Sequence, residues 1–112
     1  MERSRVGIVV PALNEESTIA AVVERISQYG QAIVVDDGST DSTAELARNA
    51  GADVVTHKVN QGYDGALNTG FARAAALGCT YIITIDADGQ HNPTQLTQMI
   101  ALLEEGNDLV LG

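Results

Sequence analysis

The sequence predicts an α/β fold in which a mostly parallel, Rossmann-like sheet is covered by helices on both faces. Short apolar runs rich in β-branched residues alternate along the chain with segments of helical periodicity. The runs are apolar throughout, as in strands that are buried on both sides of a sheet. Several of them end abruptly in polar or acidic residues next to a glycine. With 112 residues, the chain has the length of one domain.

The first two strand and helix pairs follow directly from this pattern. The apolar run at 6–10 predicts a strand that stops at Pro11, and a loop is expected over 11–16. A helix follows, because Ile19, Val22, Val23 and Ile26 have the i, i+3, i+4, i+7 spacing of an amphipathic helix. The run at 32–35 predicts the second strand, and a helix is expected over 42–49.

The second half of the chain repeats the unit. A third strand is predicted over 53–56, and a helix begins near Gly62 after a longer loop. The run at 81–85 predicts the fourth strand. Asn92 and Pro93 are a strong helix start, and the apolar stripe that follows extends to Leu103. The residues at 108–111 begin a fifth strand, so we predict five strands with right-handed crossovers.

Composition and charge limit the classes of function. The chain is 45% hydrophobic and 19% charged, which is typical of a soluble globular protein. Six basic and fifteen acidic residues give a net charge of −9, which disfavours nucleic acid or an anionic membrane as the main partner. No run has the length of a membrane span, residues 1–5 carry no secretory signal, and the single Cys79 fits a reducing compartment. We therefore expect a cytoplasmic protein.

The strand order decides which loops meet. With the order 3-2-1-4-5, the order reverses between the first and fourth strands, and ligands bind at the carboxyl ends of parallel strands near such a reversal. This places the loop at 11–16 beside 86–90, with the loop at 36–41 next to them. Carboxylates from all three loops would then converge, and none of these loops contains a basic residue. Such a cluster costs stability unless a cation or the hydrogen-bond donors of a ligand relieve the repulsion.

The acidic residues suit a metal and a nucleotide. Asp88 can give one oxygen to Mg²⁺ or Mn²⁺, with Gln90 or water as a further ligand and diphosphate oxygens completing the octahedron. The ion would act as a Lewis acid on a leaving nucleoside diphosphate. Asp37 and Glu15 are acceptors for the N–H groups of a base or for ribose hydroxyls. Asp86 would accept from a ribose or sugar hydroxyl, or order its loop.

Several neighbouring residues have purely structural interpretations. Asp36 suits backbone N–H groups, and the residues at 39–41 suit a turn and a helix cap. Asn14 fits either a role in fixing the backbone of its loop or a contact with ligand. His91 is expected to pack or to cap a helix, with a ligand role as the alternative. The segment at 60–68 is glycine-rich at a helix start, which suits either N–H contacts with an anion or a flexible loop.

Four motifs in order carry a resemblance to a known family. They are Pro11-Ala-Leu-Asn-Glu15, Val34-Val-Asp-Asp-Gly-Ser-Thr-Asp41, Asn60-x-Gly62 and Asp86-Ala-Asp-Gly-Gln-His-Asn-Pro93. Together they resemble the signatures of family 2 glycosyltransferases with the GT-A fold, and most of all those of polyprenyl-phosphate or dolichyl-phosphate mannosyl- and glucosyltransferases. The resemblance covers nearly the whole chain.

The resemblance implies metal-dependent, inverting transfer of a sugar from a UDP or GDP donor. It implies that the nucleoside pocket is lined by Pro11, Leu13, Glu15 and Asp37. Asp86 and Ala87 would lie against the nucleotide sugar, Asp88 with Gln90 would hold Mg²⁺ or Mn²⁺, and Asp86 and Asp88 would be the catalytic carboxylates. The sequence departs from the family pattern at Asp64, where the family often has a small or basic residue.

The resemblance also bounds the domain. We expect residues 1–112 to form the nucleotide-sugar-binding domain, with the acceptor site and any general base beyond Gly112, so that the chain alone is inactive or weakly active. The acceptor would be a polyprenyl phosphate or a saccharide, at the cytoplasmic face of a membrane reached through other regions. The fifth strand would be an open edge able to pair with a second copy. The alternative function is a module that binds nucleotide sugar without catalysis.

Overall fold

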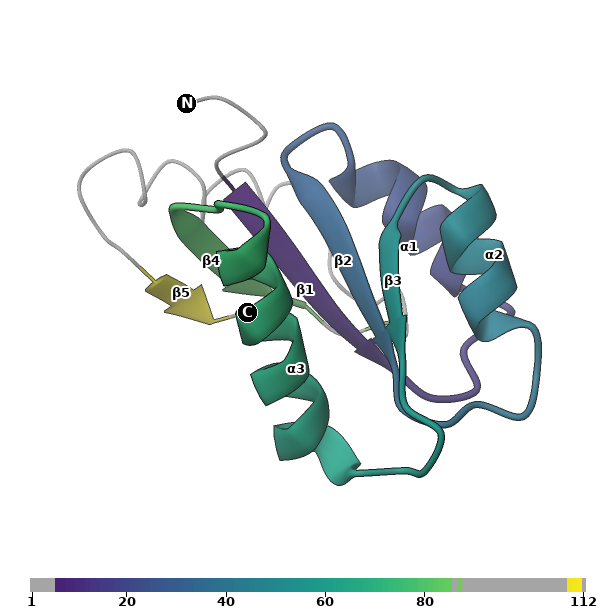
Figure 1. Cartoon of the computed structure of the whole chain (residues 1–112). Coiled ribbons are helices and arrows are strands. Elements are labelled where there is room, and N and C mark those ends of the chain that lie inside the picture. Colours follow the sequence, from purple (N-terminus) through teal and green to yellow (C-terminus); the bar gives the residue numbers. More distant parts are fainter. Residues whose placement is uncertain (1–5, 86, 88–108, 112) are drawn as a thin grey trace.

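A computed structural model describes residues 6–85, 87 and 109–111 of the chain. Within them lies a five-stranded sheet of order β3-β2-β1-β4-β5 in which all neighbours are parallel, so the predicted order is confirmed (Figure 1). The strands are β1 (Val6–Ala12), β2 (Gln31–Asp36), β3 (Asp53–Thr56), β4 (Tyr81–Thr84) and β5 (Leu109–Leu111). The order reverses at β1 and β4, which is where we expected a ligand to bind.

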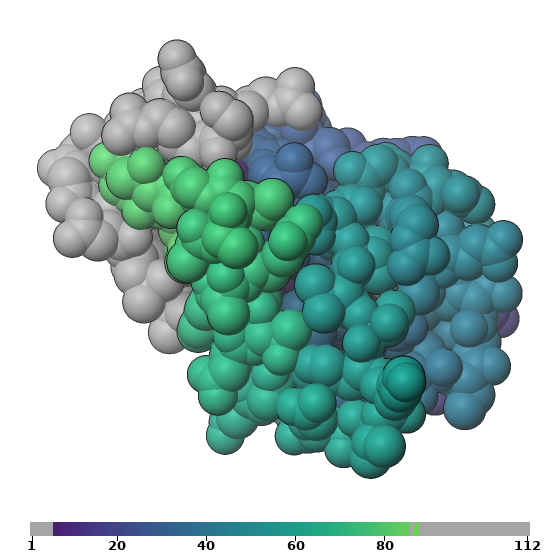
Figure 2. Space-filling view, viewed as in Figure 1, coloured from purple at the N-terminus to yellow at the C-terminus, as the bar shows by residue number. Residues whose placement is uncertain are grey.

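Helices cover both faces of the sheet, as predicted. Figure 1 shows α1 (Ile19–Ile26) and α2 (Thr43–Asn49) on one face, and α3 (Gly62–Ala76) crossing the other. Figure 2, viewed from the same side, shows α3 and the segment leading into it at the molecular surface. No helix among the described residues combines the length and the hydrophobicity needed to cross a bilayer. The helix predicted over 92–103 lies outside the described residues.

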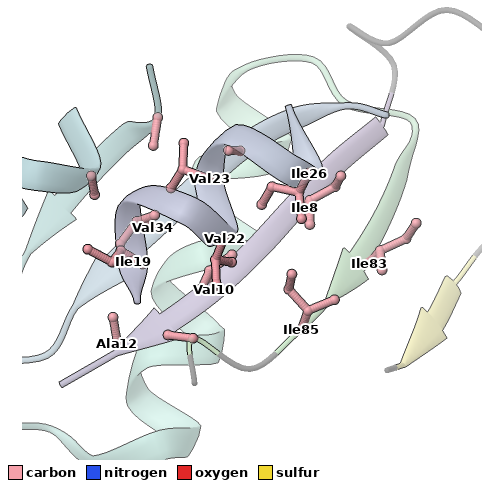
Figure 3. Close-up of a cluster of buried hydrophobic side chains, with 14 of the residues drawn as sticks. Ile8, Val10, Ala12, Ile19, Val22, Val23, Ile26, Val34, Ile83 and Ile85 are labelled. Atoms are coloured by element: carbon pink, nitrogen blue, oxygen red, sulfur yellow. The ribbon is translucent and has the colours of Figure 1, made fainter. Parts of the chain in front are cut away.

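Side chains that alternate along the strands form two cores. The larger core lies between the sheet and the pair α1 and α2, and Figure 3 shows Ile8 and Val10 of β1 beneath α1. The smaller core lies under α3, where the intervening Val9 packs with Ile33 and Ala74. Both faces of β1 are therefore buried. This explains why its sequence is apolar at consecutive positions rather than at alternate ones.

β1 extends two residues beyond the predicted end at Val10. Pro11 and Ala12 remain paired with β2, opposite Val35 and Asp36. A proline is tolerated because its missing N–H lies on the side of β4, and the paired register of β4 ends at Thr84, opposite Val9. The predicted loop at 11–16 therefore begins as strand, which carries Pro11 rigidly to the binding edge.

Close packing of α3 on β1 requires glycine at one position. A methyl group on the buried Gly70 would lie 2.3 Å from Cγ1 of Val9, far inside van der Waals contact. Val9 is fully buried and β-branched, so it has little freedom to move aside. The distance between α3 and the sheet is thus set by the absence of a side chain at Gly70.

Gly70→Ala is expected to destabilise the fold by about 1–3 kcal/mol, because overpacking outweighs the better helix propensity of alanine. Urea unfolding at neutral pH measures the change. Asn68→Ala, on the exposed side of the same helix, is the control and should be neutral or slightly stabilising. Equal effects of the two substitutions would contradict the close contact with Val9.

Candidate functional site

A pocket of about 400 Å³ opens where the carboxyl ends of the strands meet. Residues from the end of β1, from the loops after β1 and β2, and from the start of α3 surround it, together with Ala87 after β4. The lining residues are Pro11, Ala12, Leu13, Glu15, Asp37, Asn60, Gly62, Tyr63, Ala66 and Ala87. The convergence of these loops was predicted from the strand order, and the described residues bear it out.

Asn14 ties the first two loops together. Its backbone has a positive φ of 53°, a conformation that asparagine tolerates better than most residues. The Asn14 N–H donates to Oγ of Ser39 at 2.8 Å, and its side-chain Oδ1 accepts from the N–H of Thr40 at 2.9 Å. Asn14 therefore fixes its loop, which is one of the two roles that the sequence left open for it. It does so by hydrogen bonds to the neighbouring loop.

Asp36 has the structural role predicted for it, whereas Asp41 binds the start of α2 from the position before the N-cap residue, Ser42. Oδ1 of Asp36 accepts the N–H of Ser39 at 3.0 Å, which closes the turn after β2. Oδ1 of Asp41 accepts the N–H and the hydroxyl of Thr43, at the first turn of α2. The hydrogen bond from that hydroxyl is the main reason why the pKa of Asp41 is lowered. Oγ1 of the buried Thr43 in turn accepts the N–H of Glu15 at 2.9 Å.

Asp37 is a buried carboxylate with three donors. Its residue is only 5% exposed. Oδ1 accepts the N–H of Gln61 and the ring Nδ1–H of His57, both at 2.8 Å, and Oδ2 accepts the N–H of Gly62 at 2.9 Å. Burial acts to raise the pKa of Asp37, but the hydrogen bonds from Gln61, His57 and Gly62 outweigh it and bring the pKa below the ordinary value. Asp37 is therefore ionised at neutral pH.

These contacts correct two expectations. The charge of Asp37 is compensated within the protein by N–H donors and by His57, so its repulsion with Glu15 does not depend on a ligand for relief. The glycine-rich segment does offer backbone N–H groups to an anion, but that anion is the Asp37 carboxylate. A carboxylate has about four acceptor positions, so Asp37 keeps about one, on Oδ2, for a ligand in the pocket.

His57 is the residue that sequence reasoning missed. It follows the last residue of β3, and its side chain is 7% exposed. Its second ring nitrogen, Nε2, lies 2.8 Å from Oγ1 of Thr69 on α3. Its position in the sequence could have indicated this role. His57 directly follows β3 and Asp37 directly follows β2, so both residues lie at the same edge of the parallel sheet.

The predicted site residues divide into two groups. Pro11, Leu13, Glu15, Asp37 and Ala87 all line the pocket described above. Ala87 is buried, and its carbonyl accepts the Thr18 hydroxyl at 2.7 Å, which ties the end of β4 to the start of α1. The second group, Asp86, Asp88 and Gln90, lies outside the described residues, as does His91. Within the described part of the chain, no three side chains of the metal-binding types gather closely enough to hold an ion.

A family model for glycosyl transferase family 2 matches residues 7–112. The chain belongs to this family. The resemblance read from the four sequence motifs is therefore confirmed.

Similar proteins agree with this family. An uncharacterised protein of Methanocaldococcus jannaschii is 39% identical over 115 residues, covering 100% of this chain and 47% of the relative. The UDP-N-acetylglucosamine–dolichyl-phosphate N-acetylglucosaminyltransferase of Methanococcus voltae is 31% identical over 125 residues, covering 94% of this chain and 50% of the relative. The chain thus spans about half the length of these relatives.

A solved glycosyltransferase has the same fold. The crystal structure of glucosyl-3-phosphoglycerate synthase from Mycobacterium tuberculosis with Mn²⁺, UDP-glucose and phosphoglyceric acid matches with a TM-score of 0.71 and 30% identity. The match covers 91% of this chain and 40% of that chain. The predicted GT-A architecture is confirmed by this likeness.

Asp37→Asn is expected to destabilise the protein by about 1–3 kcal/mol at pH 7, because an amide cannot accept all three hydrogen bonds. The folded-state pKa of Asp37 is below its unfolded value, so its stabilising effect is fully present above about pH 4 and is lost as pH falls through the folded pKa. Urea unfolding of both proteins at pH 7, 5 and 3 should show a difference that shrinks only at the lowest pH. A difference that stays constant down to pH 3 would count against this assignment.

Proposed function

We propose that the chain is the donor-binding part of a metal-dependent, inverting glycosyltransferase that transfers a sugar from a UDP- or GDP-linked donor. The observation that carries the proposal is the pocket at the β1 and β4 reversal. In this family 2 glycosyltransferase chain, the pocket brings together residues from the end of β1, from the loops after β1 and β2, and from the segment after β4: Pro11, Leu13, Glu15, Asp37 and Ala87. The structural relative bound to Mn²⁺ and UDP-glucose supports a nucleotide-sugar donor.

The nucleoside would occupy the described pocket. Pro11 and Leu13 supply apolar surface for the base, and Leu13 is 43% exposed, so its side chain is open to a ligand. Glu15 is more open than Asp37 to a base N–H or to ribose hydroxyls, because it lines the pocket without the three donors that surround Asp37. Asp37 would contribute its remaining acceptor position on Oδ2.

The diphosphate and sugar would lie next to Ala87. This residue lines the pocket, and Asp86 and Asp88 are its neighbours in the sequence. Asp88, with Gln90, would hold Mg²⁺ or Mn²⁺, since both ions favour oxygen ligands and are commonly held by one or two carboxylates together with substrate phosphates. When bound, the ion neutralises charge on the departing nucleoside diphosphate. Asp86 would accept from a sugar or ribose hydroxyl.

For the acceptor, we propose a polyprenyl phosphate, with a saccharide as the alternative. The relative from Methanococcus voltae is named for dolichyl phosphate, which supports a lipid-linked phosphate. The acceptor-binding residues and a general base are assigned to chain outside residues 1–112, in line with the half-length match to the relatives. The whole enzyme would then work at the cytoplasmic face of a membrane.

Nucleoside diphosphate with Mn²⁺ is expected to stabilise the chain by about 1–3 kcal/mol at ligand concentrations well above Kd, because only the folded state binds it. Thermal unfolding measures the shift, and titration with UDP, GDP and their sugars identifies the base. Asp88→Ala should abolish the part of the shift that depends on Mn²⁺ and leave the part caused by nucleotide alone.

The matched control is Glu24→Ala, which removes an exposed carboxylate on α1 away from the pocket lining. It should keep the full shift. The metal assignment is wrong if Asp88→Ala and the parent show the same dependence on Mn²⁺. The nucleotide assignment is wrong if neither UDP nor GDP changes the midpoint with or without the ion.

We also propose that two copies pair through β5, the last strand of the described sheet. An edge strand carries unpaired N–H and C=O groups on its outer side, which a second strand can satisfy. Sedimentation equilibrium should show a dimer at high protein concentration. A monomer at all concentrations would overturn this assignment.

A further inference from the structure

His57 bridges two elements that the proposed donor site depends on. Its Nδ1 lies 2.8 Å from Oδ1 of Asp37 at the end of β2, and its Nε2 lies 2.8 Å from Oγ1 of Thr69 on α3. The side chains of His57 and Asp37 are each 7% exposed. His57 itself does not line the pocket, so contact with a ligand does not account for this arrangement.

The direction of both hydrogen bonds follows from the charge of Asp37. An ionised carboxylate can only accept, so the His57 ring must donate from Nδ1. In the neutral ring, Nε2 is then the acceptor of a hydrogen bond that the Thr69 hydroxyl donates. The hydroxyl of Thr69 can rotate, so it also accepts from Nε2 if the ring is charged. The bridge between Asp37 and α3 is therefore kept in either charge state.

The backbone that follows His57 also connects Asp37 to the pocket lining. The N–H of His57 donates to the carbonyl of Asp36 at 2.9 Å, which continues the β2 and β3 pairing by one residue. Three residues later, Oδ1 of Asn60 accepts the N–H of Gly62 at 3.0 Å, and that N–H also bonds Asp37. Asn60 and Gly62 line the pocket. A shift of the Asp37 carboxylate would therefore also move Asn60 and Gly62, which line the pocket.

We propose that His57 is a positioning residue that holds the Asp37 carboxylate and the turn at 60–62 in the arrangement that receives a nucleoside diphosphate. The inference rests on the proposed donor-binding function. His57 acts through Asp37: the ring and Gln61 hold Oδ1, which fixes the orientation of a carboxylate that lines the pocket and bonds Gly62 through Oδ2. Without the ring, Asp37 can rotate, and the N–H groups of Gln61 and Gly62 lose their common acceptor.

The experiment compares His57→Ala, His57→Asn and a matched control. In His57→Asn, the amide N–H replaces the Nδ1 donor to Asp37, whereas the link to Thr69 is lost. The control is Arg73→Met, which removes a different β3 to α3 link, the pair of bonds from Nε and Nη2 of Arg73 to Asp53 at 2.9 and 2.8 Å. Neither Arg73 nor Asp53 lines the pocket.

Calorimetric titration with UDP and with GDP, in the presence of Mn²⁺, is the first readout. His57→Ala should weaken binding about tenfold or more, as expected from the loss of a hydrogen bond to a charged group, and His57→Asn should restore most of the affinity. Arg73→Met should lower the thermal midpoint with affinity unchanged. If affinity falls in step with the midpoint in all three variants, His57 has a structural role alone and the proposal is overturned.

Amide hydrogen exchange without nucleotide is the second readout. The Gln61 and Gly62 amides should exchange about tenfold faster or more in His57→Ala than in the parent, and nearly as slowly in His57→Asn as in the parent. Unchanged exchange in His57→Ala overturns the positioning role whatever the affinities show. If the parent binds neither UDP nor GDP, the proposed function fails and the nucleotide part of this inference fails with it, while faster exchange in His57→Ala still supports control of the turn by His57.

Discussion

The burial of one ionised carboxylate constrains the whole binding edge. Asp37 is 5% exposed, and a buried charge is tolerated only when hydrogen-bond donors replace the lost water. Those donors come from the segment at 57–62, after β3, so this segment must fold back over the end of β2. The start of α3 is fixed by the same bonds, and the far part of α3 is fixed by its contact at Gly70. The position of the pocket wall is thus a consequence of satisfying Asp37.

The two acidic residues of the described pocket have different tasks for this reason. Three of the acceptor positions of Asp37 are already used by the protein, and this carboxylate is part of the scaffold as much as of the binding surface. Glu15 lines the same pocket, and its backbone N–H is held by the buried Thr43. The backbone of Glu15 is therefore fixed while its carboxylate stays available. From residue type alone, Asp37 and Glu15 were both predicted to accept hydrogen bonds from the nucleoside. Their different hydrogen-bond partners in the structure distinguish the two side chains.

The regular elements could be predicted from the sequence because burial on both faces gives β1, β2 and β4 continuous apolar runs, and α1 has a clear apolar stripe. The end of β1 was misjudged at Pro11, since the tolerance for proline depends on where β4 ends. Contacts between loops could not be predicted from the sequence either, because they also depend on segments that are distant in the chain. The bonds of His57 to Asp37 and Thr69 join residues 20 and 12 positions apart, and no local periodicity encodes such pairs.

The hydrogen bonds of Asp37 also bear on how this acidic chain would hold a diphosphate. A helix start with free N–H groups is a common anion site, and the entry to α3 has the glycines for one. Its Gln61 and Gly62 N–H groups are instead bonded to Asp37. With a net charge of −9 and these donors already used, neutralisation of a diphosphate in this pocket falls to another positive group. The divalent cation proposed above, with Asp88 as a ligand, would meet that need, and this electrostatic requirement is the physical reason for proposing a metal.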